Sequence, residues 1–178
     1  MNLFSANIED LRALYINSLQ KALDMEQKIT KALPTMVEKS TDRDLAAAFR
    51  NHLQQSQGHV SKIETLLRNA TNDADTVTCK VITSLINEAE GMTRDASAPA
   101  IRDVSLIAAG QQVEHHEIAI YGTLRSWAEL LGLDTDAEVL ESILTEEKDA
   151  DRLLSDLSDS INTTAEAPAA PRAPHRAA

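Results

Sequence analysis

The stretch QQVEHHEIAIY, residues 111–121, lies in a long run of helix-forming residues and places two carboxylates, Glu114 and Glu117, three residues apart. Side chains with this spacing share one face of an α-helix. Glu117 also belongs to a row of positions spaced alternately three and four apart, whose other members are Leu106, Gly110, Val113, Ile120 and Leu124. This row predicts a face that packs into a core. A carboxylate buried there needs a partner that compensates its charge.

The composition around this stretch favours helices along the whole chain. The 178 residues include five Gly and 3% aromatic residues, and such a composition is typical of helices rather than sheets. Long segments with a helical apolar period span residues 8–39, 41–69, 100–131 and 135–161, and a shorter one spans 77–92. The length suits one domain with a sizeable core. We therefore expect an all-α fold.

The short links between the long segments predict two antiparallel helix hairpins. Thr41 is a candidate N-cap for the second helix, Gly132 a candidate C′ residue for the third, and Thr135 with Glu138 a candidate capping box for the fourth. A long middle connection with a short helix can cross from one hairpin to the other, which predicts a ferritin-like four-helix bundle over residues 1–162. Residues 163–178, rich in Ala and Pro, are expected to form a disordered tail.

Every long segment carries polar side chains in the middle of its apolar row. Residues equidistant from the turn of an antiparallel hairpin lie at the same height, so these side chains are expected to meet. His59 lies one helical turn from Gln55. The pairs expected at equal height are Glu26 with Gln55, Glu114 with Glu147, and Glu117 with Asp151.

A metal centre is one way to compensate so many inward carboxylates. Few Lys or Arg occupy these rows, so internal salt bridges are a poor explanation. A carboxylate-rich cage with an imidazole suits Fe or Mn, and two ions bridged by carboxylates would neutralise it. The predicted metal ligands are Glu26, His59, Glu114, Glu117, Glu147 and Asp151. His52 is predicted to be a packed core histidine, and Tyr121 either a hydrogen-bond donor to a ligand or a core aromatic residue.

The alternative is a non-enzymatic bundle whose buried acids are protonated or hydrogen-bonded. The two interpretations make opposite predictions. Protonated acids would make stability fall as pH rises through their pKa values, whereas a metal site needs deprotonated ligands and loses stability on chelation.

The charge and the apolar pattern exclude several classes of partner. A formal net charge of −11 argues against nucleic-acid binding, which needs Lys and Arg to displace counterions from phosphates. No apolar run approaches the length of a membrane span, and a single cysteine, Cys79, cannot form an intramolecular disulfide. A soluble cytoplasmic protein is expected, and a homodimer is the default assembly.

Several segments resemble the YciF/YciE family of ferritin-like bacterial stress proteins. The segments are KALPTM after Met25 and Glu26, HLQQSQGHVSKIE, LIAAGQQVEHHEIAIYGTL and LTEEKDAD. The resemblance covers the chain up to about Ile161 and implies a rubrerythrin-like bundle, commonly dimeric, with a dinuclear metal site and no well-established reaction. The family's acidic pattern falls on Glu26, Glu114, Glu117 and Glu147, with an Asp near Asp151.

One departure from the family pattern concerns the second helix. The family usually has Glu where this chain has Gln55, in a pattern that reads HLQQS here, and often Gln where this chain has His59. A neutral amide is a weaker ligand than a carboxylate. Three alternatives follow: His59 replaces the missing ligand, the site holds a single metal ion, or it holds none.

Overall fold

The structure is a computed structural model that describes residues 8–166. Over this range the chain forms five α-helices and no β-strand, which confirms the predicted all-α class. No helix within it is both long and apolar enough to cross a membrane. The helices are α1 (Leu11–Lys39), α2 (Arg43–Thr71), α3 (Lys80–Asp95), α4 (Pro99–Leu130) and α5 (Asp134–Glu166).

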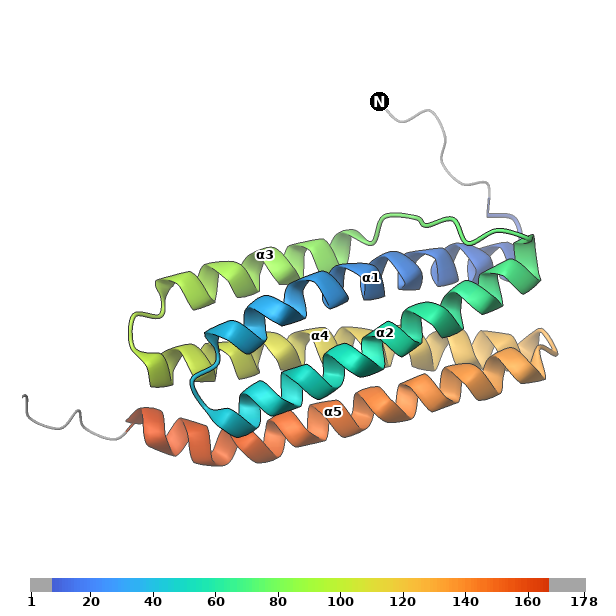
Figure 1. Cartoon of the computed structure of the whole chain (residues 1–178). Helices are drawn as coiled ribbons and strands as arrows, with labels where there is room; N and C mark the ends of the chain where they lie inside the picture. The colour runs from blue at the N-terminus through green and yellow to red at the C-terminus, as the bar shows by residue number, and fades with distance from the viewer. Residues whose placement is uncertain (1–7, 167–178) are drawn as a thin grey trace, which may run out of the picture.

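The helices are arranged as two antiparallel hairpins, α1 with α2 and α4 with α5 (Figure 1). The hairpins pack together through α1 against α4 and through α2 against α5. The connection between them contains α3, which packs on α4 and α1. Each of the four long helices, α1, α2, α4 and α5, therefore has one face that can contribute to a shared core.

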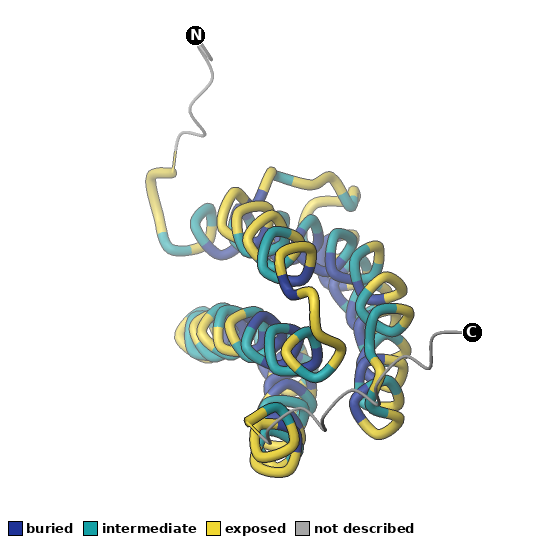
Figure 2. The backbone as a smooth tube through the Cα atoms, turned by 90° about the vertical axis from the view of Figure 1, so that its left-hand side faces the viewer, coloured by how far each residue is buried: buried dark blue, intermediate teal, exposed yellow. Residues whose placement is uncertain are grey.

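The core consists of the apolar rows seen in the sequence. Buried positions face the space between the helices, and exposed positions lie on the outside (Figure 2). Leu19, Leu23, Leu45, Ile63 and Leu140 are completely buried. Each such side chain contributes roughly 1.5–3 kcal/mol by leaving water. This packing fixes the rotation of each helix and so decides which polar side chains point inward.

The turn between α1 and α2 differs in detail from the prediction. Asp42 is the N-cap of α2, since its Oδ1 accepts from the backbone N–H groups of Asp44 and Leu45, both at 2.9 Å. Thr41, predicted to be the cap, instead donates its backbone N–H to Asp103 Oδ1 of α4 at 2.8 Å, and its hydroxyl donates to the same carboxylate. Because this carboxylate engages Thr41, the cap falls one residue later.

The turn between α4 and α5 follows the prediction more closely. Gly132 has a φ of +67°, the left-handed conformation expected of a C′ glycine. Helix α5 begins at Asp134 and continues to Glu166, so Thr135 lies within its first turn and is not the N-cap that was predicted. Residues 163–166 are therefore helical rather than part of the tail, because the first proline after the helix is Pro168. The rest of the predicted tail, 167–178, lies outside the described residues.

Candidate metal centre

The polar side chains in the core form two groups, each able to hold a metal ion. The His52 group consists of His52 from α2, Glu114 and Glu117 from α4, and Glu147 from α5. The His59 group consists of Glu26 from α1, His59 from α2, and the same Glu147. Within each group the candidate ligand atoms all lie within 4.8 Å of one another. Glu147 belongs to both groups, so the two form one continuous centre.

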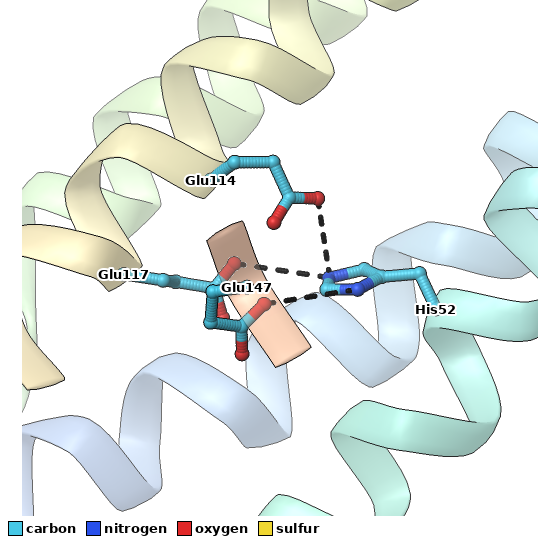
Figure 3. A group of neighbouring side chains, drawn as sticks. All are labelled: His52, Glu114, Glu117 and Glu147. Carbon is cyan, nitrogen blue, oxygen red and sulfur yellow. Dashed lines mark ion pairs between the residues drawn. The ribbon is translucent and has the colours of Figure 1, made fainter. Parts of the chain in front are cut away.

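In the His52 group three carboxylates surround one imidazole (Figure 3). His52 Nε2 lies 3.5 Å from Glu114 Oε1 and 3.8 Å from Glu117 Oε2, and His52 Nδ1 lies 3.8 Å from Glu147 Oε2. These contacts are longer than hydrogen bonds. The imidazole thus lies within ion-pair distance of all three carboxylates without a hydrogen bond to any of them.

In the His59 group the two ring nitrogens have different surroundings. His59 Nδ1 lies 3.0 Å from Glu147 Oε1 and 3.3 Å from Glu26 Oε1, but it is not aligned for a hydrogen bond with either. His59 Nε2 lies 2.9 Å from Glu146 Oε2, and Glu146 also accepts from Lys62 at 3.0 Å. Metal-binding histidines usually donate their second ring N–H to a carboxylate in this way. Glu146 can therefore hold His59 with Nδ1 directed at the centre.

The polar atoms of the centre lack partners, which is the main sign that they suit a cation. Unpaired buried side-chain atoms normally cost free energy, and buried charges more so. The buried atoms of the centre without a hydrogen bond are Glu26 Oε2, His52 Nδ1, His59 Nδ1, Glu114 Oε2, and both carboxylate oxygens of Glu117 and Glu147. Carboxylate oxygens and imidazole nitrogens are a donor set that Fe and Mn accept. The residues present therefore fit a metal centre.

Burial and mutual repulsion shift the pKa values of the carboxylates. Burial raises the pKa of Glu114 well above its usual value, and the charges of Glu117 and Glu147 add to this effect against the opposing influence of His52. Burial likewise raises the pKa of Glu117, with further contributions from Glu147 and Glu26. Without a cation, these two side chains favour the protonated form.

The pKa of His59 shifts in the direction that offsets this charge. Burial lowers it, but the adjacent carboxylates of Glu147 and Glu26 outweigh burial and raise the pKa to about 11. In the metal-free protein His59 is therefore an imidazolium between carboxylates. This cation compensates part of the negative charge that a metal ion would otherwise neutralise.

Tyr121 is a hydrogen-bond donor to a candidate ligand, the first of the two roles predicted for it. Its hydroxyl donates to Glu26 Oε1, and its ring meets the His59 ring edge-on at 6.2 Å. Burial and the charge of Glu26 raise the pKa of Tyr121, so the phenol stays protonated and able to donate. Tyr121 thereby fixes the orientation of the Glu26 carboxylate.

The structure brings together five of the six predicted ligands, namely Glu26, His59, Glu114, Glu117 and Glu147. Asp151 lies in neither group; its Oδ1 is buried without a hydrogen bond and lies 3.6 Å from Nε2 of the exposed His115. Gln55 is partly exposed, and its Oε1 accepts from Asn51 Nδ2 at 3.3 Å. The amide oxygen of Gln55 is thus engaged with Asn51 on the same helix.

His52 is the residue that the sequence interpretation set aside. Its signal was present, since it lies seven residues before His59, two helical turns away on the same buried row. A packed core histidine should have its nitrogens hydrogen-bonded, but His52 Nδ1 has no hydrogen-bond partner. Glu146, which the sequence interpretation did not single out as a ligand, is partly exposed and contacts buried His59.

The fold and the centre together define a class: an all-helical protein with buried histidine and glutamate side chains that could hold metal. The chain belongs to a specific family of this kind, described as a domain of unknown function (DUF892), which it matches over residues 10–167. It is 33% identical to Protein YciF of Escherichia coli (strain K12) over 162 residues, covering 90% of this chain and 98% of that protein. The predicted family relationship is confirmed.

Two solved structures share the fold. The crystal structure of the E. coli stress protein YciF superposes with a TM-score of 0.83 at 32% identity, covering 87% of this chain and 98% of that chain. YcfI from Rhodopseudomonas palustris, for which a structural role has been suggested, has a TM-score of 0.83 at 36% identity, covering 86% and 98%.

Proposed function

We propose that this chain is a bacterial stress-associated, ferritin-like four-helix protein that binds a dinuclear Fe or Mn centre in its core. The observation that carries the proposal is the set of buried carboxylate and imidazole atoms without hydrogen bonds, shared between two groups that meet at Glu147. The E. coli relative, named as a stress protein, supports the association with stress. Binding cations would remove a desolvation cost that the protein otherwise carries.

Each residue of the centre has a definable task. His52, Glu114 and Glu117 would hold one ion, Glu26 and His59 the other, and Glu147 both. The sequence alone left open which carboxylates would bridge, and the shared position of Glu147 favours that residue. Tyr121 and Glu146 orient Glu26 and His59. A bound Fe or Mn pair would supply redox chemistry with O₂ or peroxide.

A second candidate function is a non-enzymatic structural protein without metal. The observation that favours it is the His59 imidazolium, which contacts Glu26, Glu147 and Glu146 and so compensates charge internally. The structural role suggested for the Rhodopseudomonas relative is consistent with it. In this case the raised pKa values of Glu114 and Glu117 would favour their protonated forms.

Metal stoichiometry separates the two functions. The untagged protein is loaded anaerobically with Fe(II) or Mn(II), desalted, and measured by mass spectrometry beside Glu147→Gln and the control Glu138→Gln, an exposed position of the same helix. The dinuclear function predicts about two ions per chain in the wild type and control, and almost none in Glu147→Gln. One ion in the wild type would mean a mononuclear site. No retained metal would favour the structural function.

The homodimer and the cytoplasmic location stay predictions. Light scattering on the purified full-length protein would measure the mass in solution directly. A mass of one chain at micromolar concentration would contradict the dimer.

A further inference from the structure

A cavity of about 120 Å³ lies between α1, α2, α3 and α4 and ends at the candidate metal centre. Its outer rim includes the exposed side chains of Lys31, Thr35 and Glu90, and its inner end includes His52 and Glu114. The wall between the rim and the centre is largely apolar and includes Ile29, Leu33, Met36, Phe49, Ile86, Ala89, Leu106, Ala109 and Val113. The cavity is thus a connection from the molecular surface to the His52 group.

The wall of this cavity depends on a close approach at Gly110. A Cβ there would lie 3.0 Å from Leu154 Cδ1 and 3.2 Å from Phe49 Cε1. A side chain at this position would therefore displace the Phe49 ring, which lines the cavity. The glycine allows a large aromatic ring to pack on α4 beside the space without filling it.

The chemistry of the wall selects what can pass. Entering an apolar space strips an ion or a hydrogen-bonding molecule of its hydration, which costs several kcal/mol. Apolar cavities of similar size stay free of water and bind benzene or xenon. Metal ions and hydrogen peroxide are poorly suited to this space, whereas an uncharged apolar diatomic molecule meets no such penalty.

We propose that this cavity is the path by which dioxygen, a small uncharged apolar molecule, reaches the metal centre beside His52 and Glu114. The proposal rests on the metal-binding function above and adds the identity of the oxidant that the centre can receive through this route. Ala109 is buried in the wall on α4 and belongs to neither ligand group, so a larger side chain there can block the path.

Xenon tests the cavity without any metal. Methyl NMR spectra of the metal-free protein are recorded under increasing xenon pressure for the wild type, Ala109→Leu, and the control Ala119→Leu, an exposed position of the same helix. Saturable shifts of the Leu33, Leu106 and Val113 methyl groups are expected in the wild type and the control but not in Ala109→Leu. Absence of shifts in the wild type, or equal shifts in Ala109→Leu, would overturn the proposal.

Oxidation kinetics test the path. Anaerobic Fe(II)-loaded protein is mixed with O₂ or with hydrogen peroxide, and oxidation is followed by absorbance. Ala109→Leu should slow the O₂ reaction about tenfold, equal to about 1.4 kcal/mol of added barrier, at unchanged metal content and peroxide rate. Ala89→Leu, which narrows the cavity from α3 outside the two hairpins, provides a second variant should Ala109→Leu fold poorly.

The outcomes separate this proposal from the metal-binding function. Unchanged O₂ rates, or equal slowing with O₂ and peroxide, would overturn the path. Metal retention without xenon binding would overturn the cavity proposal alone. Xenon binding without metal retention would overturn the metal-binding function, and with it the destination of the path.

Discussion

Helix α4 buries carboxylates at two places with opposite surroundings. Asp103, 4% exposed, accepts from the Thr41 backbone N–H at 2.8 Å, the Asp42 backbone N–H at 3.0 Å and the Thr41 hydroxyl. Glu117, 0% exposed, accepts no hydrogen bond on either oxygen. Both residues are buried acids on one helix. The comparison teaches that burial alone does not mark a candidate ligand: Asp103 is satisfied by the protein and holds a turn, whereas both oxygens of Glu117 lack a hydrogen-bond partner.

The largest expected effect is stabilisation by metal, which should depend on Glu117 and not on Asp103. At a free metal concentration about 1,000 times Kd, binding should raise the free energy of unfolding by about 4 kcal/mol. Denaturant unfolding with Mn(II) and with chelator measures this gain. We expect the gain to disappear in Glu117→Gln and to persist in Asp103→Asn. Equal gains in both variants would contradict the comparison.

In the metal-free protein, by contrast, stability should require Asp103 and not Glu117. Asp103→Ala removes an acceptor of three hydrogen bonds and should lower the free energy of unfolding by about 2–3 kcal/mol. Glu117→Met replaces an unpaired buried acid by an apolar side chain of similar size, and should raise it by about 1–2 kcal/mol. Chemical denaturation in chelator provides both values. Destabilisation by Glu117→Met would show that Glu117 has a structural partner after all.

The pH dependence of stability should change direction with metal loading. The pKa values of Glu114 and Glu117 are raised in the folded state, so their contribution in the metal-free protein is complete below pH 4.5 and is lost as pH rises through the folded-state pKa values. Over that range the free energy of unfolding should fall by about 1.4 kcal/mol per pH unit for each titrating proton. The pKa of His59 is also raised in the folded state, to about 11. Its contribution to the free energy of unfolding is therefore likewise lost as pH rises from 6.5 to 11.

With metal present, stability over the acidic range should instead increase with pH, because binding requires deprotonated ligands. Thermal unfolding from pH 4 to 8 in chelator and in Mn(II) measures the two slopes. Parallel slopes in the two conditions would argue against coordination by these carboxylates.

The smallest expected effect is that of Gln55→Glu, which restores the family's usual residue. Gln55 is partly exposed and bonded to Asn51, so a carboxylate there should leave the metal content unchanged and alter stability by less than about 0.5 kcal/mol. Mass spectrometry of the loaded protein checks the first expectation and denaturant unfolding the second. A gain in metal content would show that position 55 does reach the centre.

Periodicity was sufficient to predict the helices and most of the centre, because apolar rows of this length leave little choice of buried face. It did not resolve side-chain direction within a face. Asp151 follows Glu147 by one turn, yet it joins neither group, and its Oδ1 lies 3.6 Å from Nε2 of His115. His52 could not be told from a packed histidine, since the distinction depends on whether neighbouring side chains satisfy its nitrogens.

The rule that residues equidistant from a hairpin turn lie side by side predicted contacts only in part. It matched Glu26 with Gln55, but the residue of α2 that faces Glu26 is His59. Height fixes the position along a helix axis and leaves the rotation about that axis undetermined. The role of Asp103 was not predictable either, because its partners, Thr41 and Asp42, are distant in the sequence.

If the centre binds two ions as proposed, the position of Glu147 in both groups has a thermodynamic consequence for how the centre fills. Two ions that share one carboxylate cannot bind independently: the first changes the charge and orientation that the second encounters, and the coupling is reciprocal. Whether the first ion assists the second by fixing Glu147, or opposes it by drawing on the same negative charge, determines the population of half-loaded protein. A titration that resolves the singly occupied species would therefore measure the coupling free energy carried by this one side chain.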